Sequence, residues 1–260
     1  MILKEYKHRP DANSKSEENC AEVSTRLRNA FKTNEDVLVM SDVVVEVEER
    51  KVNVDHVVLH PYGITLINSR TLYGKIEVNY RQVWNRIVNG REIPMENPIE
   101  LFKYVSRELR NKLNNHTAEV LTRHNGVQKG FEVLPIEVIF VQAPKTTIQG
   151  NGINQSFIMT VEQVTQSINR SFSSYKKREF QMYGGMESFK FTPSDMHATA
   201  DLLMGNVIDR SQYPAAESAQ TQAVKQGRRG IVRAVSTLRP HIIKGRDIKP
   251  GRQRDNEPAQ

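Results

Sequence analysis

Residues 54–70 read Val-Asp-His-Val-Val-Leu-His-Pro-Tyr-Gly-Ile-Thr-Leu-Ile-Asn-Ser-Arg, and the rest of the chain is interpreted around this stretch. Val, Ile, Leu and Thr fill both halves, and Pro61-Tyr62-Gly63 places a fixed φ and a permissive glycine between them. The pattern predicts two short strands joined by a turn. Because side chains alternate along a strand, we expect Asn68 and Arg70 to share one face, which the turn can bring beside Asp55.

Asp55 followed by the polar pair Asn68 and Arg70 is the layout of a metal-dependent phosphodiesterase site. Carboxylates hold the hard cation, and a nearby cationic group orients the nucleophile or steadies the phosphate. Such a site needs a second acid, and this stretch lacks one. The alternative is that Asp55 is a turn-entry residue whose carboxylate is hydrogen-bonded to backbone.

Strand and helix patterns follow one another on both sides of this stretch. An apolar run at 134–141 is nearly continuous, which predicts a strand buried on both faces. The sequence as a whole predicts an α/β fold with a mixed central β-sheet flanked by helices on both faces. The other predicted strands are 36–48, 74–78, 157–159 and a hairpin on Asn89-Gly90; the predicted helices are 17–31 with Ser16 as N-cap, Asn97-Pro98 to about 113, 117–123, Thr160 to about 170, and one from Thr192-Pro193.

Composition excludes several classes of protein. The chain has 260 residues, of which 38% are hydrophobic and 26% charged, with a mean hydropathy of −0.57. No apolar run approaches the ~20 residues that span a bilayer, and the first residues lack the apolar core of a secretory signal. The single Cys20 cannot form an internal disulfide, so we expect a cytoplasmic location and no membrane contact.

The net charge of +7 is concentrated near the end of the chain. Between Lys225 and Arg254 there are ten basic residues and one acid; removing them from the totals of 37 and 30 leaves 27 basic and 29 acidic residues elsewhere. A basic, flexible segment attracts the phosphate backbone of DNA or RNA through counterion release, with Arg228 and Arg229 among the contacts. The alternative is a solubilising terminus with no dedicated partner.

These patterns divide the chain into four parts. We expect a loose N-terminus at 1–16, a folded domain at 17–170, a helical extension packed on that domain at 171–205, and a basic, largely disordered tail at 206–260. Residues 171–178 mix aromatic side chains with Lys176, Lys177 and Arg178, which suits stacking on bases and contact with phosphates. The same mixture is also common at a helix end.

Several of these elements together resemble the nuclease-related domain (NERD) family over about residues 17–170. They are Glu22 on a leading helix, the Val-Asp-His strand, the Pro-Tyr-Gly-Ile turn, the Ile-Asn-Ser-Arg strand end, Tyr73-Gly74-Lys75-Ile76, Trp84, and Asn97-Pro98 at a helix start. The resemblance implies a restriction-endonuclease-like fold, nucleic acid as substrate, and a divalent metal such as Mg²⁺ or Mn²⁺ as cofactor.

The resemblance also implies roles for individual residues. Asp55 occupies the metal-binding aspartate position, His56 the position beside it, and Glu22 that of the helix glutamate and second metal ligand. Asn68 and Arg70 stand where the family has the Glu and Lys of its Glu-x-Lys motif. An amide removes a charge from a dication site, and an arginine with a pKa above ~12 cannot act as a base, although it can grip phosphate. We therefore expect a degenerate catalytic set, with metal weakly bound or absent.

Three hypotheses follow. The first is a nucleic-acid-binding protein in which Arg70, Lys75 and the basic segments hold phosphate. The second is an active metal-dependent nuclease with a relocated acid, for which Glu46, Glu48 and Glu77 are the strand candidates. The third is an interaction or scaffold protein that keeps only the fold and binds a protein partner. The first is preferred, and the oligomeric state is left open.

Overall fold

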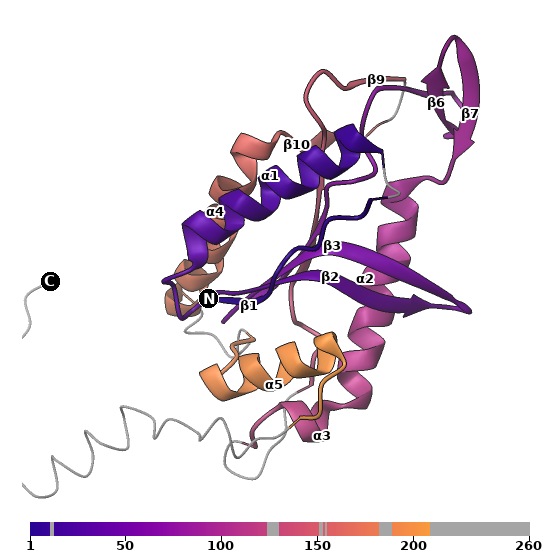
Figure 1. Cartoon of the computed structure of the whole chain (residues 1–260). Helices are drawn as coiled ribbons and strands as arrows, with labels where there is room; N and C mark the ends of the chain where they lie inside the picture. Colours follow the sequence, from indigo (N-terminus) through magenta and orange to yellow (C-terminus); the bar gives the residue numbers. More distant parts are fainter. Residues whose placement is uncertain (11–12, 124–129, 151–152, 154, 182–188, 209–260) are drawn as a thin grey trace, which may run out of the picture. The chain divides into compact units, whose positions relative to one another are not determined.

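The predicted hairpin is the centre of the fold and is longer than expected (Figure 1). The computed structural model describes residues 1–10, 13–123, 130–150, 153, 155–181 and 189–208; in it β3 spans Arg50–His60 and β4 spans Gly63–Asn68. The two strands are antiparallel. A Cβ at Gly63 would lie only 2.9 Å from the carbonyl oxygen of Pro135, so glycine is required at this close approach. The same oxygen accepts a hydrogen bond from the backbone N–H of Ile64, 2.9 Å away.

Six strands form the larger sheet, in the order β1-β2-β3-β4-β8-β10. β2 and β3 are antiparallel, as are β3 and β4, whereas β1 pairs with β2, β8 with β4, and β10 with β8 in parallel. The sheet is therefore mixed, as predicted. The bounds of the remaining strands are Ile2–Lys4 for β1, Leu38–Val47 for β2, Ile136–Val141 for β8 and Ile158–Met159 for β10, which follows a short 3-10 helix at Gln155–Phe157.

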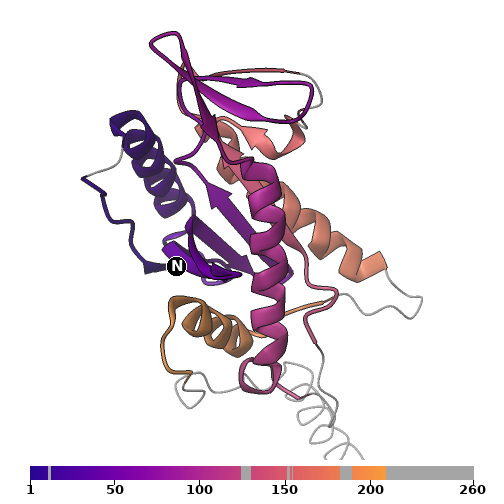
Figure 2. The same ribbon diagram turned by 90° about the vertical axis from the view of Figure 1, so that its right-hand side faces the viewer.

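Helices cover both faces of this sheet (Figures 1 and 2). On one face α1 packs on α4, and their apolar side chains share one core cluster with the sheet. On the other face α2 and α5 contact β2, and α3 contacts α5. The predicted layering is therefore confirmed. The bounds are Ser14–Phe31 for α1, Pro98–Asn115 for α2, Thr117–Val120 for α3, Val161–Gln181 for α4 and Pro193–Met204 for α5.

A second mixed sheet, which the sequence did not separate from the first, has the order β7-β6-β5-β9. The predicted Asn89-Gly90 turn joins β6 and β7, and both residues have positive φ, 52° and 75°. Trp84 at the start of β6 is buried and anchors this sheet in the core. The bounds are Lys75–Val78 for β5, Trp84–Val88 for β6, Arg91–Met95 for β7 and Thr147–Gly150 for β9.

Local signals placed most helix starts correctly. Asn97 caps α2 through its side chain, and Thr192 with Asp195 forms a capping box on α5. For α1 the cap is Asn13, not Ser16, because the helix begins three residues earlier than predicted. The strand at β8 is only half-buried over residues 136–138, since β10 pairs with its last two residues alone.

Two predicted boundaries are wrong. Residues 1–16 are not loose throughout, because Ile2–Lys4 pair with β2 and the first turn of α1 lies within this range. The division at 170/171 falls inside α4, which is continuous to Gln181. α5 packs on the sheet as expected, and residues 209–260 lie outside the described part of the chain. Among the described residues, none of the helices combines the length and apolar content needed to cross a membrane.

Candidate functional site

Asp55 lies near the end of the β3–β4 ladder, and both of its carboxylate oxygens are occupied. Oδ2 accepts hydrogen bonds from the backbone N–H groups of Ser69 and Arg70, at 2.7 and 3.0 Å. Oδ1 accepts one from Nη1 of Arg70 at 2.6 Å. Asp55 therefore does stabilise the chain at a strand end, as the backbone-bonding interpretation proposed, and it also forms an ion pair.

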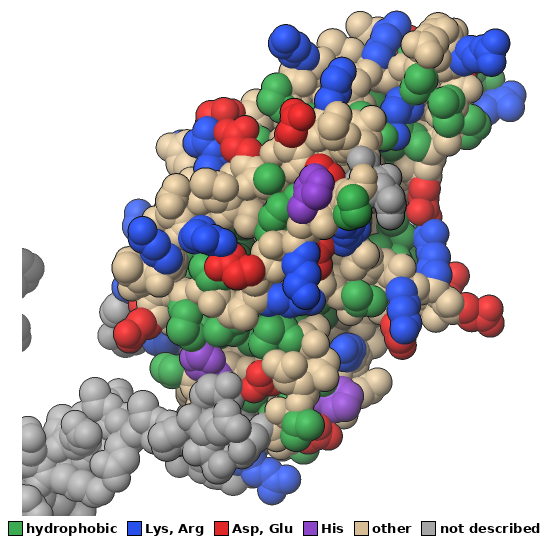
Figure 3. Space-filling model, viewed as in Figure 1, with side chains coloured by type: hydrophobic (Ala, Val, Ile, Leu, Met, Phe, Trp, Pro, Cys, Tyr) green, Lys and Arg blue, Asp and Glu red, His purple; other side chains and the backbone are tan. Residues whose placement is uncertain are grey.

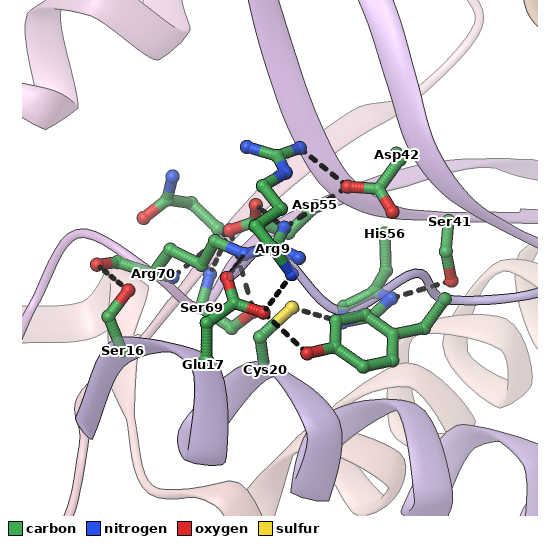
Figure 4. A network of polar contacts seen from close by, with 12 residues as sticks. Arg9, Ser16, Glu17, Cys20, Ser41, Asp42, Asp55, His56, Ser69 and Arg70 are labelled. Carbon is green, nitrogen blue, oxygen red and sulfur yellow. Dashed lines mark hydrogen bonds and ion pairs between the residues drawn. The ribbon is translucent and has the colours of Figure 1, made fainter. Parts of the chain in front are cut away.

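The Arg70 guanidinium is the centre of this cluster (Figure 4). Its Nε donates to Oε1 of Glu17 on α1 at 2.5 Å, and its Nη1 contacts Oδ1 of Asp42 on β2 at 3.2 Å and Oδ1 of Asp55 at 2.6 Å. The Arg70 side chain is only 9% exposed. One cation thus holds together acids from three different elements, and we call Glu17, Asp42, Asp55 and Arg70 the arginine cluster.

Asp42 enters the cluster through an irregularity in β2. It lies between Ser41, which pairs with His56, and Val43, which pairs with Val54, so it faces Asp55 across the two strands. Its φ of 52° is in the left-handed region, which aspartate tolerates better than most residues. Two carboxylates opposite one another repel, and the guanidinium between them offsets that repulsion.

The N-terminal segment covers the arginine cluster. Arg9 donates from Nη2 to Asp42 at 2.5 Å, and its backbone N–H donates to Glu17 at 3.1 Å. The Tyr6 hydroxyl donates to the second oxygen of Glu17 at 2.5 Å, and its ring centroid lies 5.4 Å from the Arg70 guanidinium carbon. Residues that the sequence suggested were loose therefore complete the cluster.

These contacts keep Glu17 and Arg70 ionised. Burial alone would raise the pKa of Glu17, but the hydrogen bonds from Arg70 and Tyr6 hold that pKa at about 2. Burial would lower the pKa of Arg70, and the bonds to Glu17 and Asp55 more than reverse this, so its pKa is raised. The arginine cluster has three carboxylates and one guanidinium, a formal charge of −2, and Arg9 beside it reduces this to −1.

The predicted site residues are only partly brought together. Asn68 is the last residue of β4, so the strand alternation from which a shared face with Arg70 was predicted does not extend to Arg70. The amide oxygen of Asn68 instead accepts from the backbone N–H of Thr71 at 3.3 Å. Glu22 pairs with Arg26 one turn further along α1. Glu22 follows Glu17 by five positions, which places the two glutamates on different sides of the helix.

The family comparison agrees with this region of the chain. Residues 14–140 match the family model described as nuclease-related domain. This segment is a nuclease-related domain. No curated protein and no solved structure matches the chain significantly, so the restriction-endonuclease-like fold stays a prediction.

The nuclease-related domain does not offer a ready metal site in this chain. Within the described ranges, no three His, Cys, Asp or Glu side chains are arranged to hold a metal ion. The oxygens that would serve as ligands on Asp55 and Glu17 already accept hydrogen bonds from Arg70, Ser69, Tyr6 and Arg9. A dication would have to displace a buried guanidinium, so the donor set as arranged does not fit Mg²⁺ or Mn²⁺.

The acids beside Asp55 are not those predicted as replacements. Glu46 and Glu48 are exposed, and Glu77 pairs with Lys75 in the smaller sheet at 2.6 Å. The acids that lie beside Asp55 are instead Glu17 and Asp42, both of which contact Arg70. A signal for Asp42 exists in the sequence, because Ser41-Asp42 interrupts an apolar strand at a position that alternation cannot explain.

The predicted nucleic-acid contacts are spread over several places. Lys176, Lys177 and Arg178 are exposed on α4, whereas the aromatic residues among them are used in packing. The Phe172 ring lies against His60 and Tyr62, and the Tyr175 hydroxyl donates to Glu137 at 3.0 Å. Arg228 and Arg229 lie outside the described residues.

His56 and His60 are buried in the core of the nuclease-related domain. His56 contacts Ser41 Oγ at 3.0 Å and Cys20 Sγ at 3.4 Å, and His60 Nδ1 accepts from the backbone N–H of Tyr62 at 3.2 Å. Burial lowers the pKa of each histidine to about 4. Both are therefore neutral at pH 7.

We expect stability to fall as the pH drops from about 6.5 to 4. In that window the unfolded chain protonates His56 and His60 while the folded protein does not, so ΔG of unfolding should decrease by up to about 2.7 kcal/mol per pH unit for the two groups together. Urea unfolding between pH 7.5 and 4.5 measures this. His60→Gln should halve the slope, and a constant ΔG between pH 6.5 and 4.5 would contradict the assignment.

Proposed function

We propose that the protein binds nucleic acid and that its nuclease-related domain does not cleave it. The observation that supports this most directly is the position of Arg70. Its guanidinium lies among Glu17, Asp42 and Asp55, where hydrolysis would require a free dication site. Arginine cannot replace a lysine or a metal in activating water, because it neither loses a proton nor opens a coordination position.

Binding is supported by charge rather than by the arginine cluster, which has a net negative charge. The exposed cations of α4 and the ten basic residues between Lys225 and Arg254 provide sequence-independent attraction for phosphates. We further propose DNA or RNA as the partner and the cytoplasm as the location, the latter from the single Cys20.

A second candidate is an active nuclease. Three acids from α1, β2 and β3 contact one guanidinium, and they would form a cation site if Arg70 moved away and the carboxylates moved closer together. In this case nucleic acid would be cleaved in the presence of Mg²⁺ or Mn²⁺, and Asp55→Asn would abolish cleavage. The scaffold alternative predicts neither binding nor cleavage.

Salt dependence tests the binding proposal. We expect the full-length protein to bind a fluorescein-labelled oligonucleotide with an affinity that falls steeply as salt increases, measured by anisotropy. Arg228→Gln/Arg229→Gln should lower the slope of log K against log salt by about two, since two phosphate contacts are removed.

Lys103→Gln/Arg107→Gln is the matched control, because it also removes two charges but from α2, where each cation pairs with a glutamate. An equal change of this slope in both double variants would show that binding depends only on the total charge and not on Arg228 and Arg229. If the natural protein does not bind DNA or RNA at low salt, the scaffold alternative replaces this proposal.

A further inference from the structure

A cavity lies beside the arginine cluster, on the side of the smaller sheet. Its volume is about 410 Å³, and its lining comes from the first turn of α1, the segment after β4, strand β6, and the first turn of α2. Ser16, Thr71, Tyr73, Arg86 and Leu101 are among the lining residues. The size is that of sites for small ligands or single groups of a larger one.

Arg86 is the distinctive residue of this cavity. Its guanidinium lies 3.7 Å from the centroid of the Tyr73 ring and donates to the Tyr73 hydroxyl at 2.9 Å and to the carbonyl oxygen of Thr71 at 2.7 Å. These bonds use two of the five N–H donors of a guanidinium and hold its plane in a fixed position. Its Nε is buried without a hydrogen-bond acceptor among the described residues.

The charge of Arg86 is not balanced within the described part of the chain. Arg70, the other cation of the lining, is already paired with the acids of the arginine cluster. Glu96, the acid of the lining, is held by Arg50, with contacts of 2.5 and 3.1 Å. Arg86 itself forms no ion pair with a described residue, so the cavity presents a fixed, unpaired positive charge.

The surroundings favour an anion as well. Lys and Arg side chains gather over the end of the molecule formed by β6 and β7 (Figure 3). Near the same sheet, Arg81 lies over the ring of Tyr80, which is 76% exposed and available for stacking. Asn13, the N-cap of α1, also lines the cavity, and the N-terminus of a helix adds a weak positive potential.

We propose that this cavity binds a phosphate group of a single nucleic acid strand, with Arg86 as the phosphate ligand. The inference rests on the proposed function and assigns it a specific subsite. A guanidinium offers a planar pair of N–H donors to phosphate oxygens, and Arg86 is preorganised for this by Tyr73 and Thr71. The arginine cluster keeps Arg70 occupied, so the phosphate is held beside the former catalytic position and not in it.

The test compares Arg86→Gln with Arg91→Gln in binding a short fluorescein-labelled single strand. Both variants remove one charge from the β6–β7 hairpin, but Arg91 does not line the cavity. We expect Kd to rise roughly tenfold or more for Arg86→Gln and only about twofold for Arg91→Gln, because a bidentate contact is lost in the first and bulk attraction in the second. Arg86→Lys should give an intermediate Kd, since it keeps the positive charge but loses the planar pair of N–H donors.

A second variant covers the case in which Arg86→Gln unfolds. Leu101→Trp fills the cavity from α2 and leaves Arg86, Tyr73 and Thr71 in place, and it should also weaken binding by about tenfold while the melting temperature is kept. Equal affinities for Arg86→Gln and Arg91→Gln, or unchanged affinity for Leu101→Trp, would overturn the cavity proposal while leaving the proposed function standing. If the natural protein does not bind the strand, both the cavity proposal and the proposed function are contradicted.

Discussion

Replacing Arg70 with alanine is expected to lower the free energy of unfolding by about 3–5 kcal/mol, because it leaves buried carboxylates without their cation. Glu17 and Asp55 have side chains only 2% and 3% exposed, and Asp42 is 15% exposed. Three carboxylates without Arg70 would repel one another at short range in a medium of low dielectric constant. Urea denaturation at pH 7 measures the loss, and lowering the pH should partly restore stability as the acids are protonated.

Arg26→Ala is the control for this prediction. Arg26 also pairs with a glutamate of α1, Glu22, but both side chains are about 40% exposed, and an exposed pair contributes about 0–1 kcal/mol. Adding Mg²⁺ or Mn²⁺ to Arg70→Ala should raise its melting temperature, because the freed acids form a site for a dication, while the natural protein should not respond. A loss of unfolding free energy below about 1 kcal/mol for Arg70→Ala would show that the three carboxylates do not depend on Arg70 for their stability in the fold.

Local chemistry in the sequence predicted much of the fold. The Pro-Tyr-Gly turn, the Asn89-Gly90 turn and the caps at Asn97 and Thr192 are each signals within a few residues, and each was confirmed. What failed depends on contacts between distant segments. β1 is three residues long and exists because it pairs with β2, which no short pattern could reveal. The separation into two sheets has the same cause, since 68 residues lie between the end of β5 and the start of β9.

The sequence predicted the two main residues of the candidate site, Asp55 and Arg70, but not the geometry of the site. Asp55 and Arg70 do meet, because the β3–β4 register and the chain after Asn68 bring them together. Their partners Glu17 and Asp42 were missed, since one depends on the start of α1 and the other on a positive φ within a strand. The first is a property of packing that a residue pattern does not encode, whereas the Ser41-Asp42 interruption of an apolar strand is a sequence signal for the second.

The arginine cluster offsets the repulsion among its three acids with a cation from within the chain. Carboxylates gathered in one place need a compensating charge, and a buried guanidinium supplies it from within the chain. Arg70 reaches Glu17, Asp42 and Asp55 at once because its donors are spread over a planar fork. A lysine ammonium has its three donors on one atom, so it lacks the spread of donors with which Arg70 reaches Glu17 through Nε and the two aspartates through Nη1.

Restoring the family motif with Asn68→Glu/Arg70→Lys is expected to create a metal site and, with it, cleavage of nucleic acid. Glu at 68 adds a carboxylate at the end of β4, beside Asp55, and Lys at 70 releases acids that the guanidinium held. Calorimetric titration should show Mg²⁺ or Mn²⁺ binding with a Kd of roughly 10⁻³ M or tighter for the double variant and no binding at the cluster for the natural protein. Cleavage of a labelled strand should appear only in the double variant with metal.

Two further variants separate the contributions. Asn68→Glu alone keeps Arg70 in the cluster, so we expect weak or no metal binding from it, and the triple variant with Asp55→Asn should lose the metal gained by the double variant. Should the natural protein itself bind Mn²⁺ in an Asp55-dependent way and cut nucleic acid, Arg70 would have to leave the cluster, and the active-nuclease candidate would replace the binding proposal. Because Arg70 is held by Glu17, Asp42 and Asp55 together, that displacement would have to overcome all three ion pairs at once, which is why we expect the natural protein not to cleave nucleic acid.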